Sequence, residues 1–234
     1  MHFDRMPRKG LFYSLMLSVA LMAQGCRSVN PVYDTFTNVL PRSLLVTNLQ
    51  PGFEYLWVSV YGKASVMALG ARETRGNAVH EHWYNGQGEM LHLVDGRVQQ
   101  ALGFAHELRQ QTGAPPAWAS FQGEMQRTQA QAERQAQATK DVTWKRQLDV
   151  MPGYRFGVQE TLVSRTLAEP DRLPEGVPAN AQWVADEVFG KKANGLPWVY
   201  AQRFAVANGR VVYSEQCLAP AVCLKLRPLG VVVP

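Results

Sequence analysis

Strand-like runs joined by tight turns are the feature that most limits how this chain can fold. Residues 53–61 are rich in aromatic and β-branched residues, as strands are, and they follow a Pro-Gly turn at residues 51–52. An Asp-Gly pair at residues 95–96 and an Asn-Gly pair at residues 208–209 each separate two such runs. These pairs favour type I′ hairpin turns, because both central positions need a positive φ. Consecutive strands joined in this way pair antiparallel, so the sequence predicts a mainly β fold of antiparallel sheets.

Further strand-like runs cover most of the remaining chain, and a few segments carry other signals. Residues 102–109 are predicted to form one of a few short helices, and a cluster of prolines predicts a loop at residues 169–180. The apolar tail up to residue 233 is expected to close a sheet. Strands are predicted at residues 65–69, 90–94, 97–102, 143–150, 154–163, 181–189, 198–206 and 210–217.

Two landmarks recur in the same order along the chain. A Pro-Gly turn followed by an aromatic strand occurs in each half of the sequence, and a hairpin turn follows later in both. We therefore predict two similar β-rich halves, residues 44–112 and 143–234, which form sandwich-like or barrel-like units. The alternative is coincidence, because both turn signals are common. Residues 113–142 are rich in Gln and Ala, which predicts a helical segment or a linker.

The N-terminus has the charge order of a secretory signal. Three basic residues before position 10 precede an apolar run at residues 11–23, and small residues lead into Cys26. The apolar run is too short for a good transmembrane helix. We therefore predict a signal peptide at residues 1–25 and a polar tether at residues 26–43. An ordinary secreted protein cleaved near Ala23, or an uncleaved membrane anchor, is the alternative.

A signal that ends directly on a cysteine resembles the lipobox of bacterial lipoproteins. The resemblance implies that the thiol of Cys26 carries a diglyceride and that its new amine carries a further acyl chain such as palmitate. Two or more such chains make membrane attachment stable. Arg27 follows the cysteine, where an Asp would resemble an inner-membrane retention signal. We therefore expect a lipid-anchored protein of the outer membrane that faces the periplasm.

The charge and cysteine content narrow the possible partners. Without residues 1–25 the chain has 21 basic and 18 acidic residues, a net charge of +3, which is not the footprint of a nucleic-acid-binding protein. Besides Cys26, the chain has only Cys217 and Cys223. In an oxidising periplasm this pair is a disulfide candidate, with two unpaired core thiols as the alternative.

Few residues suggest catalytic or metal chemistry. His80 and His82 are expected on one face of a strand, with His92 on its hairpin partner, and zinc can use such a set. No acidic residue is clearly placed to support these imidazoles, so we predict neither a metal nor another cofactor. The adjacent Asp186 and Glu187 should face opposite sides of a strand, where a structural role or a salt bridge to Arg203 or Arg210 is expected. No Gly-x-Ser-x-Gly or phosphate-binding loop occurs, and no catalytic residues are predicted.

Aromatic side chains are the best candidates for a binding surface. Exposed aromatic residues can stack on sugar rings or contact a protein, although in sheets such residues more often belong to the core. The residues that we predict to contact a glycan or a partner are Trp57, Trp83, Tyr84, Trp198 and Tyr200.

Several short stretches of the second half resemble the YjbF/GfcB family of lipoproteins from group 4 capsule and exopolysaccharide operons. They are Trp-Lys-Arg at residues 144–146, Asp-Glu-Val at 186–188, the run at 198–204, Asn-Gly-Arg-Val at 208–211 and Ser-Glu-Gln at 214–216. Members more often have an aromatic residue in the place of Cys217. The resemblance implies a β-rich periplasmic body that assists the secretion or assembly of a polysaccharide by binding the polymer or the export machinery, without catalysis.

Two other functions remain open on the residues alone. An enzyme acting on glycan would need two carboxylates on one face, for which Glu54, Asp186 and Glu187 are the candidates. An envelope scaffold or a carrier of an apolar ligand would need an interior cavity.

Overall fold

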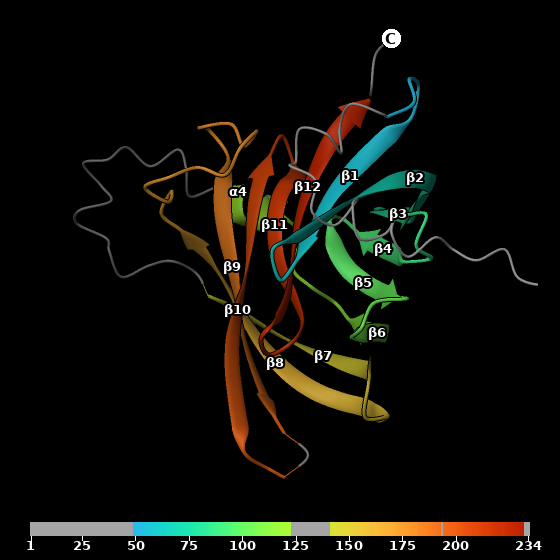
Figure 1. Cartoon of the computed structure of the whole chain (residues 1–234). Coiled ribbons are helices and arrows are strands. Elements are labelled where there is room, and N and C mark those ends of the chain that lie inside the picture. The colour runs from blue at the N-terminus through green and yellow to red at the C-terminus, as the bar shows by residue number, and fades with distance from the viewer. Residues whose placement is uncertain (1–48, 123–140, 193, 232–234) are drawn as a thin grey trace, which may run out of the picture. The chain divides into compact units, whose positions relative to one another are not determined.

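Antiparallel strands make up nearly all of the described structure. The computed structural model describes residues 49–122, 141–192 and 194–231 (Figure 1). The elements are β1 (Glu54–Val60), β2 (Lys63–Arg75), β3 (Ala78–Tyr84), β4 (Met90–Val94), β5 (Arg97–Leu102), β6 (Glu107–Gly113), α4 (Ala119–Gln122), β7 (Val142–Met151), β8 (Arg155–Leu167), β9 (Gln182–Lys191), β10 (Pro197–Ala207), β11 (Arg210–Ala219) and β12 (Val222–Val231).

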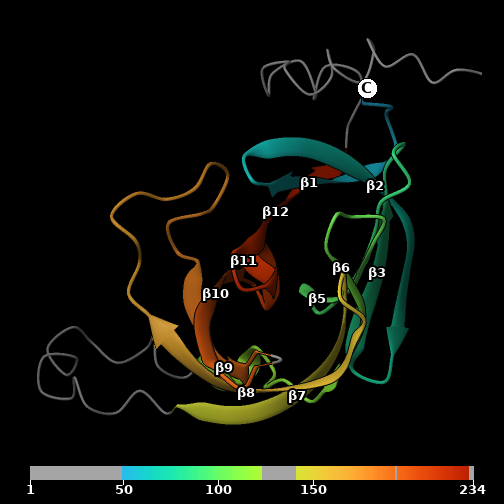
Figure 2. The same cartoon turned by 60° about the horizontal axis from the view of Figure 1, so that its bottom comes forward.

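The twelve strands close into one barrel. Each strand pairs antiparallel with the next along the chain, and β12 returns to pair with β1, so strands from both predicted halves share one sheet (Figure 2). Because the sheet closes on itself, the backbone N–H and C=O groups that an open sheet edge would leave unpaired form hydrogen bonds with a neighbouring strand. The predicted antiparallel, mainly β fold is confirmed, and the apolar tail closes the sheet as expected.

The hairpin turns define the two ends of the barrel. Both central residues have positive φ in the β4–β5 turn (Asp95 and Gly96) and in the β10–β11 turn (Asn208 and Gly209), as predicted. These two turns lie at the end where β1 begins, which we call the β1 end. The turns β7–β8, β9–β10 and β11–β12 lie at the opposite end, which we call the hairpin end; there the β9–β10 hairpin reaches the bottom of Figure 1.

The predicted helix at residues 102–109 is wrong. β5 continues to Leu102, and β6 begins at Glu107. Between them Gly103 has a φ of +79°, and a Cβ atom added there would collide with the backbone of residues 88–89. A residue with that conformation interrupts a helix, so the chain turns and pairs again as a strand.

The barrel interior is a packed core. Inward-facing apolar side chains of β1 to β7, β11 and β12 form its largest cluster, which includes Leu56, Met67 and Leu224. Across the interior, Trp118 and Phe121 come from α4 and the residues before it, and they pack against Val184, Phe204 and Val206. The predicted loop after β8 covers the outer face, where Val177 packs on Trp183 and Tyr213.

Several predicted features fall outside the described residues. The signal peptide, Cys26 and the tether lie before residue 49, and most of the Gln/Ala-rich segment lies at residues 123–140. No helix in the described part of the chain is long and apolar enough to cross a membrane. At the hairpin end, Cys217 and Cys223 face each other on β11 and β12, where they form a disulfide with Sγ atoms 2.01 Å apart.

Candidate functional site

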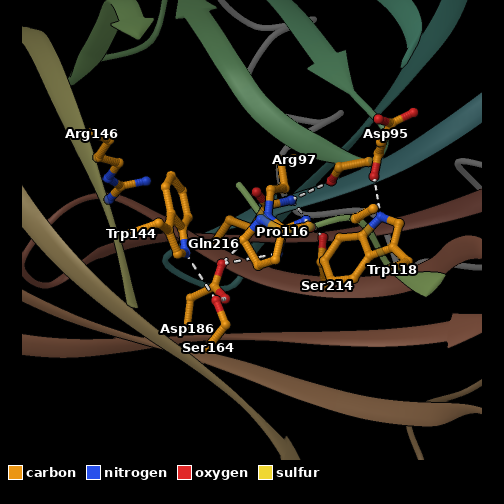
Figure 3. Close-up of polar contacts among 12 residues, drawn as sticks. Asp95, Arg97, Pro116, Trp118, Trp144, Arg146, Ser164, Asp186, Ser214 and Gln216 are labelled. Atoms are coloured by element: carbon orange, nitrogen blue, oxygen red, sulfur yellow. Dashed lines mark hydrogen bonds and ion pairs between the residues drawn. The ribbon is translucent and has the colours of Figure 1, made fainter. Parts of the chain in front are cut away.

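A buried ion pair crosses the interior of the barrel. The guanidinium of Arg97, on β5, lies 3.4 Å from Asp186 on β9, and the hydroxyl of Ser164 donates a 2.5 Å hydrogen bond to the same carboxylate (Figure 3). Arg97 is only 5% exposed and stacks on Trp118, whose ring centroid lies 3.6 Å from the guanidinium carbon. Burial lowers the pKa of Arg97, an effect opposed by the charge of Asp186.

This arrangement corrects the predicted partners of the adjacent acidic residues. Asp186 and Glu187 face opposite sides of β9, as predicted, but neither pairs with Arg203 or Arg210. Asp186 points inward to Arg97, while Glu187 points outward and pairs with Arg165 on β8. The inward position of Asp186 requires a cation from inside the barrel, and an outward residue cannot supply it.

A second buried network lies towards the hairpin end. Arg146, on β7, donates hydrogen bonds of 2.7 Å to Glu160 on β8 and 2.7 Å to the hydroxyl of Tyr200 on β10. Its third contact is a 3.0 Å hydrogen bond to the side chain of Gln111. The hydroxyl of Tyr200 and the indole of Trp198 in turn donate to Glu160, at 3.0 and 3.1 Å.

The network keeps Tyr200 a hydrogen-bond donor. Burial raises the pKa of Tyr200, and the charge of Glu160 adds to this shift, so the phenol stays protonated at neutral pH. The carboxylate of Glu160 therefore accepts bonds from an arginine, a phenol and an indole at once. These bonds fix the positions of Trp198 and Tyr200, two of the predicted contact residues.

A hollow of about 690 Å³ opens beside this network, where β8 and β9 stop pairing. Their pairing ends at Glu160 and Gly190, although β8 begins at Arg155 and β9 continues to Lys191. We call this hollow the notch. Its lining residues are Lys145, Arg155, Val158, Gln159, Glu160, Thr161, Phe189, Gly190, Lys191, Pro197, Trp198 and Val199.

Glycine and arginine shape the base of the notch. A Cβ atom at position 190 would collide with the indole of Trp198, so Gly190 makes room for that ring. The guanidinium carbon of Arg155 lies 4.8 Å from a ring centroid of Trp198, and Arg155 donates a 3.1 Å hydrogen bond to the carbonyl of Lys191. The side chain of Arg155 thus links the two strands that have separated.

A smaller cavity of about 270 Å³ lies at the β1 end, with Trp83 and Asp95 in its lining. Here Arg72 bonds Glu54 at 2.6 Å and Glu81 at 2.9 Å. The hydrogen bond from Arg72 lowers the pKa of Glu54. One guanidinium is therefore shared by two carboxylates. Its positive charge is already balanced, so this cavity is less suited to bind a charged ligand than the notch is.

The structure separates the other predicted aromatic residues from the notch. Burial removes Trp57 and Trp83 from the predicted contact surface: Trp83 is 2% exposed and belongs to the core, and the buried Trp57 lies near Arg227. Tyr84 is exposed, but β3 lies well away from β10 in the strand order.

The three histidines do come together on the outer face of β3 and β4. Nδ1 of His80 lies 3.0 Å from Nε2 of His92, and the rings of His82 and His92 stack with centroids 4.3 Å apart. Glu73 on β2 lies 4.0 Å from His82. No group of His, Cys, Asp or Glu side chains in the described ranges is arranged to hold a metal ion.

The histidine cluster predicts a pH-dependent stability. Burial, and then the charges of His82 and His80, lower the pKa of His92 from 6.5 to about 4. Between these values the unfolded chain binds a proton that the folded protein does not bind, so stability falls as the pH falls through this range. We expect the Tm of the His92→Gln variant to fall less than that of the wild type between about pH 7 and about pH 4.

Differential scanning calorimetry at stepped pH tests this expectation. The control is His106→Gln, which changes a histidine outside the cluster and should follow the wild-type profile. Parallel profiles for wild type and His92→Gln would contradict the expectation.

Sequence reasoning missed the charged residues that hold the interior together, namely Arg97, Arg146 and Glu160. A signal for Arg146 was present, because Trp144, Arg146 and Leu148 alternate on β7 and all face inward. A charged residue in such an inward series indicates a buried partner from another strand. Which residue is that partner depends on how the barrel closes.

Comparisons with known proteins agree with this fold. The sequence profile described as group 4 capsule polysaccharide lipoprotein GfcB, YjbF matches residues 40–226. The crystal structure of the hypothetical lipoprotein YmcC from Escherichia coli K12 matches with a TM-score of 0.57 and 18% identity, over 86% of this chain and 97% of that one, which shows a shared fold. No curated protein matches. The profile spans most of the chain, so the resemblance seen in the sequence is confirmed, and the chain belongs to the YjbF/GfcB family of group 4 capsule polysaccharide lipoproteins.

Proposed function

We propose that this protein is anchored to the outer membrane through acylated Cys26, faces the periplasm, and assists the secretion or assembly of a capsule or exopolysaccharide by binding. Membership of a capsule polysaccharide lipoprotein family is the observation that carries this proposal. The signal sequence that ends at Cys26 supports the anchor, and Arg27 supports the outer membrane.

The ion pairs support binding over catalysis. Glycoside hydrolysis needs one carboxylic acid to give a proton and a second carboxylate on the same site. The carboxylates named as catalytic candidates are each engaged elsewhere, Glu54 with Arg72, Asp186 with Arg97 and Glu187 with Arg165. The three carboxylates therefore lie in three separate ion pairs, and none of these pairs joins two carboxylates on one site.

The packed interior supports a surface site over an enclosed one. Apolar side chains fill the space between the described strands, and two buried ion pairs cross it, so an apolar cargo would have to displace them. The notch, in contrast, opens to solvent and presents Trp198 together with several side chains that can donate hydrogen bonds. We therefore place the binding of the polymer at the notch.

A complementation experiment tests the proposed function. Deletion of the gene should remove most secreted polymer, because the assisting protein is lost, and expression of the wild type should restore it. The Cys26→Ala variant should be present by immunoblot, fail to fractionate with the outer membrane, and fail to restore secretion.

Two outcomes of this experiment contradict the proposal. Unchanged polymer in the deletion strain, under conditions where wild-type cells secrete it, rules out a role in secretion. Wild-type protein in the inner-membrane fraction rules out the proposed location.

A further inference from the structure

We infer that the notch binds acidic sugar units, that is, saccharides with a carboxylate or phosphate group on the ring. The inference rests on the proposed function for the idea that the ligand is a saccharide. Its charge is argued from the notch alone.

Three cations in the notch have no acidic partner among the residues that the structure describes. Lys145, Arg155 and Lys191 line it, and none of them makes an ion pair with a carboxylate of the described residues. Among the described residues that line the notch, Glu160 is the only one with a carboxylate, and Arg146 already bonds it inside the barrel. A hollow surrounded by uncompensated positive charge attracts an anion, because a bound anion relieves the repulsion between the cations.

Several other cations of the barrel do contact a carboxylate. Arg72, Arg97 and Arg146 each contact a carboxylate at 3.4 Å or less. On the outer wall, Lys225 also lies 3.3 Å from Glu215. Lys145, Arg155 and Lys191 differ from these paired cations, because all three border one hollow and none of them contacts a carboxylate of the described residues.

The side chains between the cations fit the rest of a sugar. Lys145, Thr161, Phe189 and Val199 are aligned across four neighbouring strands and share the outer face. With strands about 4.8 Å apart, this row is about 14 Å long, which suits an extended chain of sugars. Phe189 is 39% exposed and Val199 is 58% exposed, so both can contact the apolar face of a pyranose ring.

The same row favours a saccharide over a lipid surface. Polar Gln159 and Thr161 lie beside the exposed apolar residues, and they can bond the hydroxyl groups of a sugar. A bilayer would leave these polar groups without partners.

Binding to a defined acidic oligosaccharide tests the inference. The probes are hexagalacturonate and its fully methyl-esterified form, titrated calorimetrically into the full-length lipoprotein in neutral detergent. We expect the free acid to bind at least about tenfold more tightly than the ester. Its affinity should fall as salt rises from about 0.02 M to about 0.3 M, because the ion pairs are exposed and therefore screened.

Matched variants assign this binding to the notch. Lys145→Gln/Lys191→Gln removes two exposed charges and should weaken hexagalacturonate binding about tenfold, while the fold is kept. Lys63→Gln/Lys225→Gln removes the same charge elsewhere on the barrel and should bind like the wild type. A third variant, Val199→Glu, places a like charge in the row and should weaken binding further.

Three results would overturn the inference. They are equal affinity of wild type and Lys145→Gln/Lys191→Gln, equal affinity for the acid and its ester, and tighter notch-dependent binding of poly-glutamate or phosphatidylglycerol vesicles than of hexagalacturonate. If the wild type restores secretion to the deletion strain but binds no acidic oligosaccharide, only the ligand class is wrong. If deletion leaves secretion unchanged, the proposed function fails whatever the notch binds.

Discussion

Replacing Asp186 with Ala is expected to lower the free energy of unfolding by about 3–5 kcal/mol. The change leaves Arg97, which is 5% exposed, without its carboxylate in the interior of the barrel. Solvent cannot reach the guanidinium, and stacking on Trp118 cannot replace an opposite charge. Ser164 loses the acceptor of its hydroxyl as well.

Urea unfolding of the purified protein, followed by near-ultraviolet circular dichroism, measures this effect. The matched control is Glu187→Ala, the adjacent residue on the outer face, where the loss of a partly exposed pair with Arg165 should cost at most about 1 kcal/mol. If Asp186→Ala unfolds within about 1 kcal/mol of the wild type, the pair does not hold the interior together. The double variant Arg97→Met/Asp186→Leu should recover most of the loss, because it leaves no buried charge.

The sequence was sufficient to predict most of the strands and the two tight hairpin turns, because these depend on local signals. The Asp-Gly and Asn-Gly pairs adopt the positive φ values that a type I′ turn needs, and aromatic and β-branched runs became strands around them. The error at residues 102–109 arose because the composition there suits a helix, while the conformation of Gly103 and pairing with β7 favour a strand.

The interior ion pairs were not predictable from local patterns. Arg97 and Asp186 are 89 residues apart in the chain, and they meet only because the barrel places β5 across from β9. An alternating pattern shows that two residues share a face. It does not show which distant strand supplies the opposite charge.

The aromatic residues show the same limit. Trp83 and Trp198 both lie within aromatic strands and both face inward. The sequence pattern alone therefore cannot tell which of them belongs to the core and which borders a binding site. Trp83 packs into the largest core cluster, whereas Trp198 lies where β8 and β9 stop pairing and borders the notch. The point at which two long strands separate depends on register, and no short motif marks it.

Replacing Glu160 with Ala is expected to lower the free energy of unfolding by about 3–5 kcal/mol and to weaken binding at the notch. The change leaves the buried guanidinium of Arg146 without its carboxylate. It also removes the hydrogen-bond acceptor of the Trp198 indole and the Tyr200 hydroxyl. Calorimetric titration with hexagalacturonate and urea unfolding measure the two effects on one preparation. The control is Gln159→Phe, which changes the preceding residue, on the outer face of β8. This variant should keep a free energy of unfolding within about 1 kcal/mol of the wild type.

A second variant separates the structural effect from the effect on binding. Arg146→Met/Glu160→Leu leaves no buried charge, so most of the stability lost in Glu160→Ala should return. The acceptor for Trp198 and Tyr200 stays absent in this variant, so the indole at the base of the notch is no longer fixed and the affinity for hexagalacturonate should stay low. If affinity returns together with stability, the network serves the fold alone, and the shape of the notch does not depend on Glu160.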